Sequence, residues 1–368
     1  MEEDTEMTDT MTSPQRVRCV LAGELPDRVP VLLQNFQNTA WLAGMNMGAF
    51  CRSGAMMAEA QLSAWDRLGH DVIDLENGTA ALAEALGCDV EYPDDEPPRV
   101  TKPVLASLDD LQRLESIDPK RDGHLPELLL ATRLVRQGVG QRACIVGEAD
   151  QGPFDLAALL LGMEAWLVAL VTPELHAGAH RLLEFCSQQA LIYARAQSEA
   201  GADFVEIGDA LASPDVCSPR IYRQFAFPYE RRIAGELNER GIPLVLHICG
   251  NATPIIADMG ATGAALLEID YKIDHARARA ATTAVIVGDV DPSGVMALGS
   301  PEEVERRCRE TIEALGSSGR FILSPGCTLP ATTPPENSAA MVETARRYGQ
   351  YGPGGLLHEK RAEEHERQ

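Results

Sequence analysis

The sequence predicts an α/β protein with the architecture of a (β/α)8 TIM barrel, built as a single domain of the 368-residue chain. Eight short runs rich in β-branched residues each end in a polar or glycine turn, and a longer segment with helical periodicity follows. Apolar residues make up 45% and aromatic residues 5%, which favours helices packed on a sheet over an aromatic-rich β-sandwich. The glycine-rich phosphate turns typical of doubly wound sheets, G-x-G-x-x-G and G-x-x-x-x-G-K-[ST], do not occur in the sequence.

The eight predicted strands follow one another along the whole chain. They are 28–35 (RVPVLLQN), 71–78 (DVIDLENG), 143–150 (ACIVGEAD), 202–209 (ADFVEIGD), 243–250 (PLVLHICG), 264–270 (AALLEID), 283–290 (TAVIVGDV) and 320–327 (RFILSPGC). Helical periodicity appears between them, for example at 174–201 and 300–319. The segment 79–142 is long for one connection, and we interpret it as an excursion over the barrel rather than a domain boundary.

The two ends of the chain differ in composition from the barrel. We expect residues 1–15 to form a disordered acidic leader, 16–352 the barrel and 353–368 a polar tail. The formal net charge of −23 argues against a nucleic-acid partner. No signal peptide opens the chain, which favours a cytoplasmic protein, and the sequence is compatible with a homodimer.

The most apolar stretch is LAALLLGMEAWLVALV, at residues 156–171. It is too short for a membrane span and contains Glu164, so a buried amphipathic helix is the better interpretation, and no membrane partner is expected. The chain has nine cysteines, an odd number, and disulfides are not the default interpretation for such a chain.

The fifth strand ends in His-x-Cys. Alternate residues of a strand share a face, so Val245, His247 and Cys249 point one way, and the aliphatic residues between them point the other. The aliphatic face suits the surrounding helices. His247 and Cys249 therefore face the barrel interior at the carboxyl end of the strand, where barrel enzymes assemble their active sites.

A third ligand is available after the eighth strand, where Cys327 follows a Pro-Gly turn. One imidazole and two thiolates suit zinc, and three protein ligands leave a position open for a substrate. The fifth and eighth strands are not neighbours, so Cys327 has to reach across the mouth on its loop. A packed histidine and an inert thiol remain the alternative for His247 and Cys249. For the other seven cysteines we favour structural roles.

Polar residues also end the other strands, which predicts a mouth that binds a metal or a small polar substrate. Among these residues we select Glu148, Glu206 and Asp289 as candidate catalytic residues, in the role of proton relay, ligand-orienting group or substrate anchor. As candidate substrate-binding residues we select Asn35, Asn77 and Asp209. The sequence does not rank these roles, and an ordinary solvated loop residue is the alternative for each.

Three segments carry a resemblance to a known family: HICGN at 247–251, VGDVDP at 287–292, and GRFILSPGCTLPATTPPENSAAMVETARRYG at 319–349. Between residues 16 and 350 the chain resembles the cobalamin-dependent methyltransferases of the uroporphyrinogen decarboxylase superfamily. The resemblance implies a zinc ion held by His247, Cys249 and Cys327. The stretches LQNFQNTAWLAGMNMGAF and GPFDLAALLLGME resemble the branch that acts on methoxylated or methylated substrates with a corrinoid protein.

The reaction implied by the resemblance is methyl transfer between cobalamin and a small methylated substrate, namely an aryl methyl ether, a methylamine or a thiol. The protein would then be the methyltransferase component of a system such as an O-demethylase. The Asp-x-His-x-x-Gly signature of corrinoid-binding modules does not occur in the sequence, so cobalamin is expected on a separate corrinoid protein.

Three alternatives stay open. Uroporphyrinogen decarboxylase anchors a substrate with eight carboxylates through an arginine motif after its first strand, whereas this chain has LLQNFQNTA there and an acidic body. A non-catalytic zinc-binding or corrinoid-binding scaffold would hold zinc through four protein ligands. A zinc-dependent hydrolase would turn over without any corrinoid.

Overall fold

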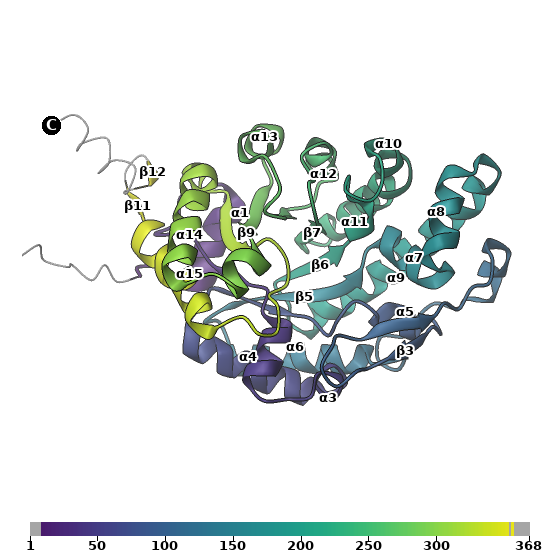
Figure 1. The fold of residues 1–368 in the computed structure, drawn as a ribbon, viewed down its shortest axis with the longest axis horizontal. Coiled ribbons are helices and arrows are strands. Elements are labelled where there is room, and N and C mark those ends of the chain that lie inside the picture. Colours follow the sequence, from purple (N-terminus) through teal and green to yellow (C-terminus); the bar gives the residue numbers. More distant parts are fainter. Residues whose placement is uncertain (1–8, 353–354, 357–368) are drawn as a thin grey trace, which may run out of the picture.

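Eight parallel strands form the central sheet of the computed structural model, which describes residues 9–352 and 355–356 (Figure 1). In their order around the sheet they are β1 (Leu32–Leu33), β2 (Val72–Leu75), β5 (Cys144–Gln151), β6 (Phe204–Gly208), β7 (Leu244–Ile248), β8 (Leu266–Ile269), β9 (Val285–Val290) and β10 (Phe321–Pro325). Val31 pairs in parallel with Leu323, which joins the last strand to the first. The predicted barrel and all eight predicted strands are confirmed.

Helices surround the sheet, and they connect successive strands (Figure 1). They are α1 (Ser13–Ala22), α2 (Phe36–Leu42), α3 (Met47–Cys51), α4 (Gly54–Leu68), α5 (Ala81–Ala85), α6 (Leu125–Val139), α7 (Pro153–Leu161), α8 (Met163–Val171), α9 (His176–Ala200), α10 (Pro219–Ile221), α11 (Phe227–Asn238), α12 (Ile256–Ala261), α13 (His275–Ala281), α14 (Pro301–Leu315) and α15 (Pro335–Tyr348). Short 3-10 or π segments, η1 (Leu108–Arg113) to η6 (Gly316–Ser318), lie between some of them.

The apolar core has an inner and an outer part. The inner part fills the lower barrel with one or two residues from each strand, and α1 adds two residues from below; its members are Val17, Val20, Leu32, Val72, Cys144, Val146, Phe204, Val245, Leu266, Val285, Val287 and Ile322. The outer part packs the other face of the strands against the helices, and it contains Leu244, Leu246 and Ile248. The alternation predicted for the fifth strand, β7, is thereby confirmed.

Charged residues hold α1 under the barrel. Both oxygens of the fully buried Asp71 carboxylate accept hydrogen bonds from arginines, at 2.5 Å from Arg16 Nη1 and 2.7 Å from Arg28 Nη1. Asp9 and Asp27 bind the outer sides of the same arginines. Bidentate guanidinium pairs of this kind fix the geometry of a buried charge.

The predicted boundary of the acidic leader needs correction. The leader was expected to run to residue 15, but α1 begins at Ser13, Thr12 forms its capping box, and Asp9 is already paired with Arg28. The Thr12 side chain and Gln15 satisfy the first free N–H groups of the helix, which starts it earlier than composition suggests. Residues 1–8 lie outside the described residues, as does most of the predicted tail; within it, Gly355–Leu356 (β12) pairs with Tyr351–Gly352 (β11).

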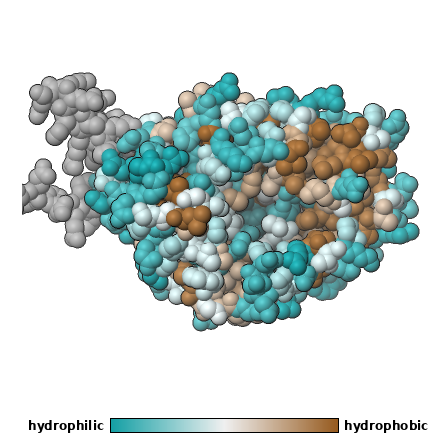
Figure 2. All heavy atoms as spheres, viewed as in Figure 1, coloured by the Kyte–Doolittle hydropathy of each residue, from teal (hydrophilic) through white to brown (hydrophobic). Residues whose placement is uncertain are grey.

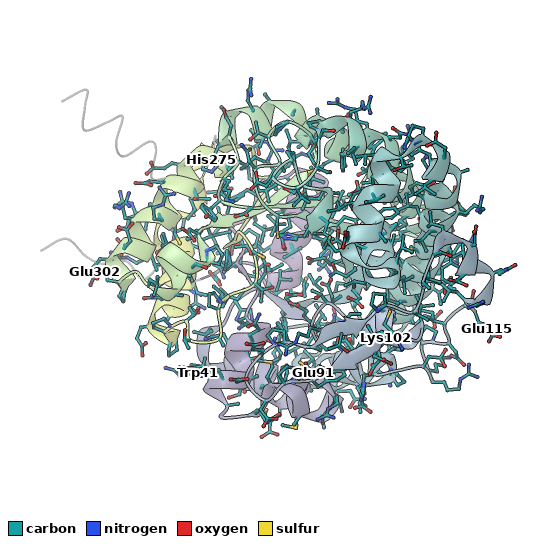
Figure 3. The ribbon with its side chains drawn as sticks, turned by 45° about the vertical axis from the view of Figure 1, so that its right-hand side comes forward. Trp41, Glu91, Lys102, Glu115, His275 and Glu302 are labelled. Atoms are coloured by element: carbon teal, nitrogen blue, oxygen red, sulfur yellow. The ribbon has the colours of Figure 1, made fainter. Side chains whose placement is uncertain are left out.

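The connection after β2 is an excursion, as predicted. It contains an antiparallel hairpin of β3 (Asp89–Glu91) and β4 (Arg99–Lys102), followed by η1 and α6. Glu91 and Lys102 of the hairpin, which are labelled in Figure 3, have exposed side chains.

The apolar stretch 156–171 differs from the single buried helix that was expected. It spans α7 and α8, which break at Gly162 and are bent by 117°. Phe154 and Trp166 pack edge to face and bury the inner side, whereas Val168 and Val171 are 49% and 67% exposed. Figure 2 shows an apolar area on the side of the molecule where Figure 1 places these helices. Among the described residues, no single helix is long and apolar enough to cross a membrane, and only this bent pair meets the criteria of length and composition.

Candidate metal centre

His247, Cys249 and Cys327 converge at the carboxyl end of the barrel. The Nε2 atom of His247 lies 2.9 Å from the Sγ atom of Cys249, which lies 3.6 Å from the Sγ atom of Cys327. The three donor atoms all lie within 4.8 Å of one another, close enough for a single ion to contact all three. One imidazole nitrogen and two sulfurs are the donor set that zinc prefers.

The loop after β10 carries Cys327 across the mouth, because Gly326 lets it lie against the loop after β8. A Cβ atom on Gly326 would be only 2.8 Å from the backbone nitrogen of Tyr271. The N–H of Gly326 donates to the carbonyl of Val290, and the side-chain amide of Gln34 donates to the carbonyl of Pro325. Glycine is therefore needed for this close approach. The loop brings Cys327 from β10 to the end of β7, as was expected for a third ligand.

Asp270, at the end of β8, braces the turn that follows Cys249. Its Oδ2 accepts from the N–H of Gly250 at 2.7 Å, and its Oδ1 accepts from the N–H of Tyr271 at 2.6 Å. Gly250 has φ of 76°, in the left-handed region, and a Cβ there would clash with Asp215 at 2.5 Å. The backbone around the thiol is thus held from a neighbouring strand.

Glu268 orients the imidazole of His247. Its Oε1 lies 2.8 Å from the Nδ1 of His247, and the glutamate is fully buried. The two atoms are at ion-pair distance, although neither Nδ1 of His247 nor an oxygen of Glu268 makes a contact with hydrogen-bond geometry in the described residues, and Nε2 faces the sulfur of Cys249. A carboxylate behind a metal-binding histidine fixes its ring orientation and makes the ligand more basic.

The charges of His247, Cys249 and Cys327, called the trio below, favour a positive ion between the two sulfurs. The hydrogen bond from the Cys249 thiol, together with His247, holds the pKa of Cys327 well below its usual range, while the same hydrogen bond and burial raise the pKa of Cys249. One proton is thus shared between two sulfurs, and the sulfurs of Cys249 and Cys327 together with Glu268 raise the pKa of His247 against the effect of burial. A divalent ion at this position would replace that proton and the positive charge of the imidazolium.

A layer of buried carboxylates fills the barrel next to the trio. Asp74, Glu148 and Glu206 place one oxygen each within 4.8 Å of one another, and Glu206 and Glu268 do the same with His247. The layer follows from strand alternation above the apolar floor, because Val72, Val146 and Phe204 each lie two residues before one of these acids. Glu148 and Glu206 are therefore brought together beside the trio.

Burial and mutual repulsion raise the pKa values of these acids strongly. Burial and then the Glu268 charge raise the pKa of Asp74 to about 8, and burial raises the pKa of Asp150 to about 7. Burial raises the pKa values of Glu148 and Glu206 well above the ordinary range, and the next cause is the charge of Glu206 for Glu148 and the charge of Glu268 for Glu206. The barrel end thus holds protons that a cation can displace.

Asp74 and Gln34 belong to this polar layer but were not selected from the sequence. Both lie before the last polar residue of their strand region, which is Asn35 after Gln34 and Glu76 after Asp74. The signal was present, since Val72 and Asp74 alternate on one face of β2 and Glu76, just after the strand, continues the pattern.

Asp289 is not in this layer, although it ends β9 with the register of an inward residue. Its Oδ2 lies 2.5 Å from the Nε2 of His275 of α13 (labelled in Figure 3), and Thr311 of α14 donates to its Oδ1 at 3.2 Å. These partners hold the carboxylate on the helix side of the barrel, so its role as a catalytic residue receives no support from the geometry.

The three substrate-binding candidates are all buried. Asp209 is fully buried, and its Oδ1 accepts from the N–H groups of Phe154 and Asp155, so it caps α7 rather than facing the mouth. Asn35 stands before α2 with its side-chain oxygen buried and without a hydrogen-bond partner in the described structure. Asn77 is 3% exposed. Asn35 and Asn77 remain candidates at the mouth.

Comparisons with known proteins match this architecture over nearly the whole chain. The chain is 33% identical to the methylcobamide:CoM methyltransferase MtbA of Methanosarcina mazei, over 92% of this chain and 98% of that protein. It is 27% identical to the uroporphyrinogen decarboxylase of Syntrophotalea carbinolica, over 82% of this chain and 86% of that protein. A solved structure described as a methyltransferase from Methanosarcina mazei superposes with a TM-score of 0.83 at 27% identity, over 91% of this chain and 98% of that one. The family model for uroporphyrinogen decarboxylase (URO-D) matches residues 12–348, and the chain belongs to that family.

Proposed function

We propose that the protein is a zinc-dependent methyltransferase that moves a methyl group between a small substrate and a corrinoid carried by a separate protein. The observation that carries this proposal is the convergence of His247, Cys249 and Cys327 at the carboxyl end of the barrel. The 33% identity with a methylcobamide:CoM methyltransferase along nearly the full length supports it.

The trio would hold zinc and leave one position open for the substrate. When bound, zinc supplies Lewis acidity, which favours the thiolate of a thiol acceptor or the leaving alkoxide or phenolate of a methyl ether donor. His247 is held by Glu268 for this purpose, and the loop of Cys327 is held by Gln34 and Gly326. The corrinoid carries the cobalt chemistry, and the protein contributes position and electrostatics.

Proton transfer is assigned to the carboxylate layer. The Oε2 atom of Glu206 is buried and has no hydrogen-bond partner within the described residues, so it is free to accept the proton of a thiol or to donate one to a leaving oxygen. Glu148 lies beside it and shares the charge. Burial and neighbouring negative charge raise the pKa values of both groups, which favours the protonated form that donates to a leaving oxygen.

Our choice of substrates rests on the resemblance to methyltransferases that act on methoxylated or methylated compounds, more than on the geometry of the site. We propose aryl methyl ethers first, with methylamines and thiols next, and therefore a place as the methyltransferase component of an O-demethylase. The geometry disfavours decarboxylation of uroporphyrinogen, because the inward residues beside the trio are Gln34, Asp74, Glu148, Glu206 and Glu268, which offer no cation to a substrate with eight carboxylates.

Metal content and methyl transfer together test the proposal. The wild type is expected to carry about one zinc per chain and, with methylcobalamin or Co(I) cobalamin, to change the cobalamin spectrum when a substrate of the panel is added. His247→Ala, Cys249→Ser and Cys327→Ala are expected to lose both properties while keeping a cooperative melting transition. Cys19→Ser, a half-buried cysteine of α1, is the matched control and is expected to keep both.

Two outcomes would contradict the proposal. Full zinc content in the variants of His247, Cys249 and Cys327 would show that these residues do not hold the metal. A folded, zinc-loaded protein that changes no cobalamin spectrum with methoxylated aromatics, methylamines or thiols would remove the activity, and decarboxylation of uroporphyrinogen would replace it.

A further inference from the structure

We propose that this site selects a small substrate with a positive charge, such as an alkylammonium group, close to the sulfur, oxygen or nitrogen that exchanges the methyl group. The inference rests on the proposed function and narrows its substrate class. It also implies that anionic substrates of the same size, such as sulfonates, are disfavoured.

The first step is the charge balance at the metal. A zinc ion bound by His247 and by the thiolates of Cys249 and Cys327 is electrically neutral with its ligands, because two negative sulfurs match its two positive charges. The metal therefore leaves nothing to offset the carboxylates next to it. Without another positive charge these acids hold protons, since their pKa values are raised, and a cationic ligand would take the place of those protons.

The second step is that carboxylate oxygens in this layer have no partner. Asp74 Oδ1 and Glu206 Oε2 are buried and make no hydrogen bond in the described part of the chain, and their side chains belong to residues only 4% and 7% exposed. A buried polar oxygen without a partner is costly, and a buried carboxylate more so. One carboxylate oxygen each from Asp74, Glu148 and Glu206 lie within 4.8 Å of one another, so three acids could contact a single ammonium group.

The third step is that the nearby basic side chains are engaged elsewhere. Lys272, on the loop after β8, donates to Asp215 at 3.0 Å. Arg16 and Arg28 are bound to Asp71 at the opposite end of the barrel. Within the described residues, no lysine or arginine forms an ion pair with Asp74, Glu148 or Glu206. Apart from the protons that the acids themselves hold, positive charge in this layer has to come with a ligand.

The position of the layer limits the size of that ligand. Glu206 and Glu268 share a group of close donor atoms with His247, so the acids are in direct reach of the metal-binding imidazole. Cys249 lies two residues further along β7 than His247, a step of about 7 Å. A spacer of two or three carbons between the reacting atom and the ammonium nitrogen fits this arrangement.

Three thiols of nearly equal size test the charge preference: 2-aminoethanethiol (cation), 2-mercaptoethanol (neutral) and 2-mercaptoethanesulfonate (anion). With zinc-loaded protein and free methylcobalamin, kcat/KM for the cation is expected to exceed that for the anion by at least about tenfold, as a charge a few ångströms from unpaired carboxylates requires. In Asp74→Asn this ratio is expected to fall several-fold. The ratio between variants cancels the different intrinsic reactivities of the thiols.

Glu302→Gln is the control for the loss of one negative charge, because Glu302 lies at the surface on α14 (Figure 3), and it is expected to leave the ratio unchanged. If Asp74→Asn does not fold, Glu148→Gln takes its place, since its oxygen belongs to the same group. A ratio near one in the wild type, or a ratio that Asp74→Asn and Glu148→Gln leave unchanged, would overturn the inference.

A binding measurement separates this inference from the proposed function. By calorimetric titration, n-propylammonium is expected to bind the zinc-loaded protein more tightly than 1-propanesulfonate, and the difference is expected to shrink in Asp74→Asn. If the cation binds preferentially and no thiol is methylated, the methyltransferase proposal fails and the charge selection stands. If thiols are methylated and the anion binds as well as the cation, the charge selection fails alone.

Discussion

The two ends of the barrel treat buried carboxylates in opposite ways. At the floor, Asp71 is fully buried and both its oxygens bind arginines, so the pKa of Asp71 is lowered by Arg28 and Arg16 despite burial. At the carboxyl end, Asp74, three residues later on the same strand region, has an unpartnered oxygen and a pKa raised by burial and by Glu268. Satisfied charge marks the structural end of the molecule, and unsatisfied charge marks the end built for a ligand.

The largest effect is expected from breaking the floor. Asp71→Asn leaves Arg16 and Arg28, which are 1% and 3% exposed, without their shared partner. Removing one member of a buried ion pair costs about 3–5 kcal/mol, so the free energy of unfolding, measured by urea denaturation, is expected to fall by about that amount. A loss below about 1 kcal/mol would show that water reaches these arginines and that the contrast between the two ends is smaller than described.

The next largest effect is expected on zinc affinity, and it tests how the loop that carries Cys327 is held in place. Gly326→Ala places a Cβ against the backbone of Tyr271 and pushes the Cys327 loop away, so zinc affinity is expected to fall by about 10–100-fold, measured by competition with a chelator. Gly235→Ala in α11 is the matched control, because nothing lies within 4 Å of its Cβ, and it is expected to keep zinc affinity. Equal affinities in the two variants would mean that the loop adapts without help from glycine.

The two ends should also respond oppositely to pH. Asp74 has a folded pKa of about 8 against an ordinary 3.8, so the folded state binds more protons between these values and its stability falls as pH rises from about 4 to 8. Asp71 has a lowered pKa, so its contribution is present above the unfolded value and is lost as pH falls through the folded one. In zinc-free protein, Asp74→Asn is expected to flatten the decline between pH 5 and 8, followed by thermal unfolding. A slope unchanged by the substitution would assign the decline to other groups, such as Asp150.

The smallest effect on stability is expected for Glu206→Gln, and it gives the clearest contrast with Asp71→Asn at the other end of the barrel. Glu206→Gln removes an uncompensated buried carboxyl group, so the zinc-free protein is expected to be unchanged or up to about 1 kcal/mol more stable, while methyl transfer is lost. Chemical denaturation and the cobalamin assay on the same preparation check both statements. A loss of stability as large as that of Asp71→Asn would instead make Glu206 part of the scaffold.

Regular alternation accounts for what could be predicted from the sequence. The strands were found because apolar runs and turns recur, and the inward direction of His247 and Cys249 followed from the two-residue period of β7. The contact between Cys249 and Cys327 was anticipated as a requirement of zinc chemistry, although nothing local to either residue specifies it.

Long-range partners account for what the sequence did not reveal. Asp289 has the register of an inward residue, yet His275 on the helix before β9 and Thr311 on the helix after it hold its carboxylate outside the barrel. Asp209 reads as a mouth residue at the end of β6, but it caps α7 of the preceding connection. Each outcome depends on a side chain or backbone group that is distant in sequence, so periodicity carries no information about it.

The helix α1 closes the bottom of the barrel, and this affects the order in which the small substrate and the corrinoid protein bind. Val17 and Val20 of α1 complete the apolar floor, so among the described residues buried apolar side chains fill that end of the barrel. A corrinoid protein that covers the mouth would also cover the route to the carboxylate layer. In the proposed reaction the small substrate therefore has to enter first and its product has to leave last, and high concentrations of the corrinoid partner should compete with substrate entry instead of accelerating turnover.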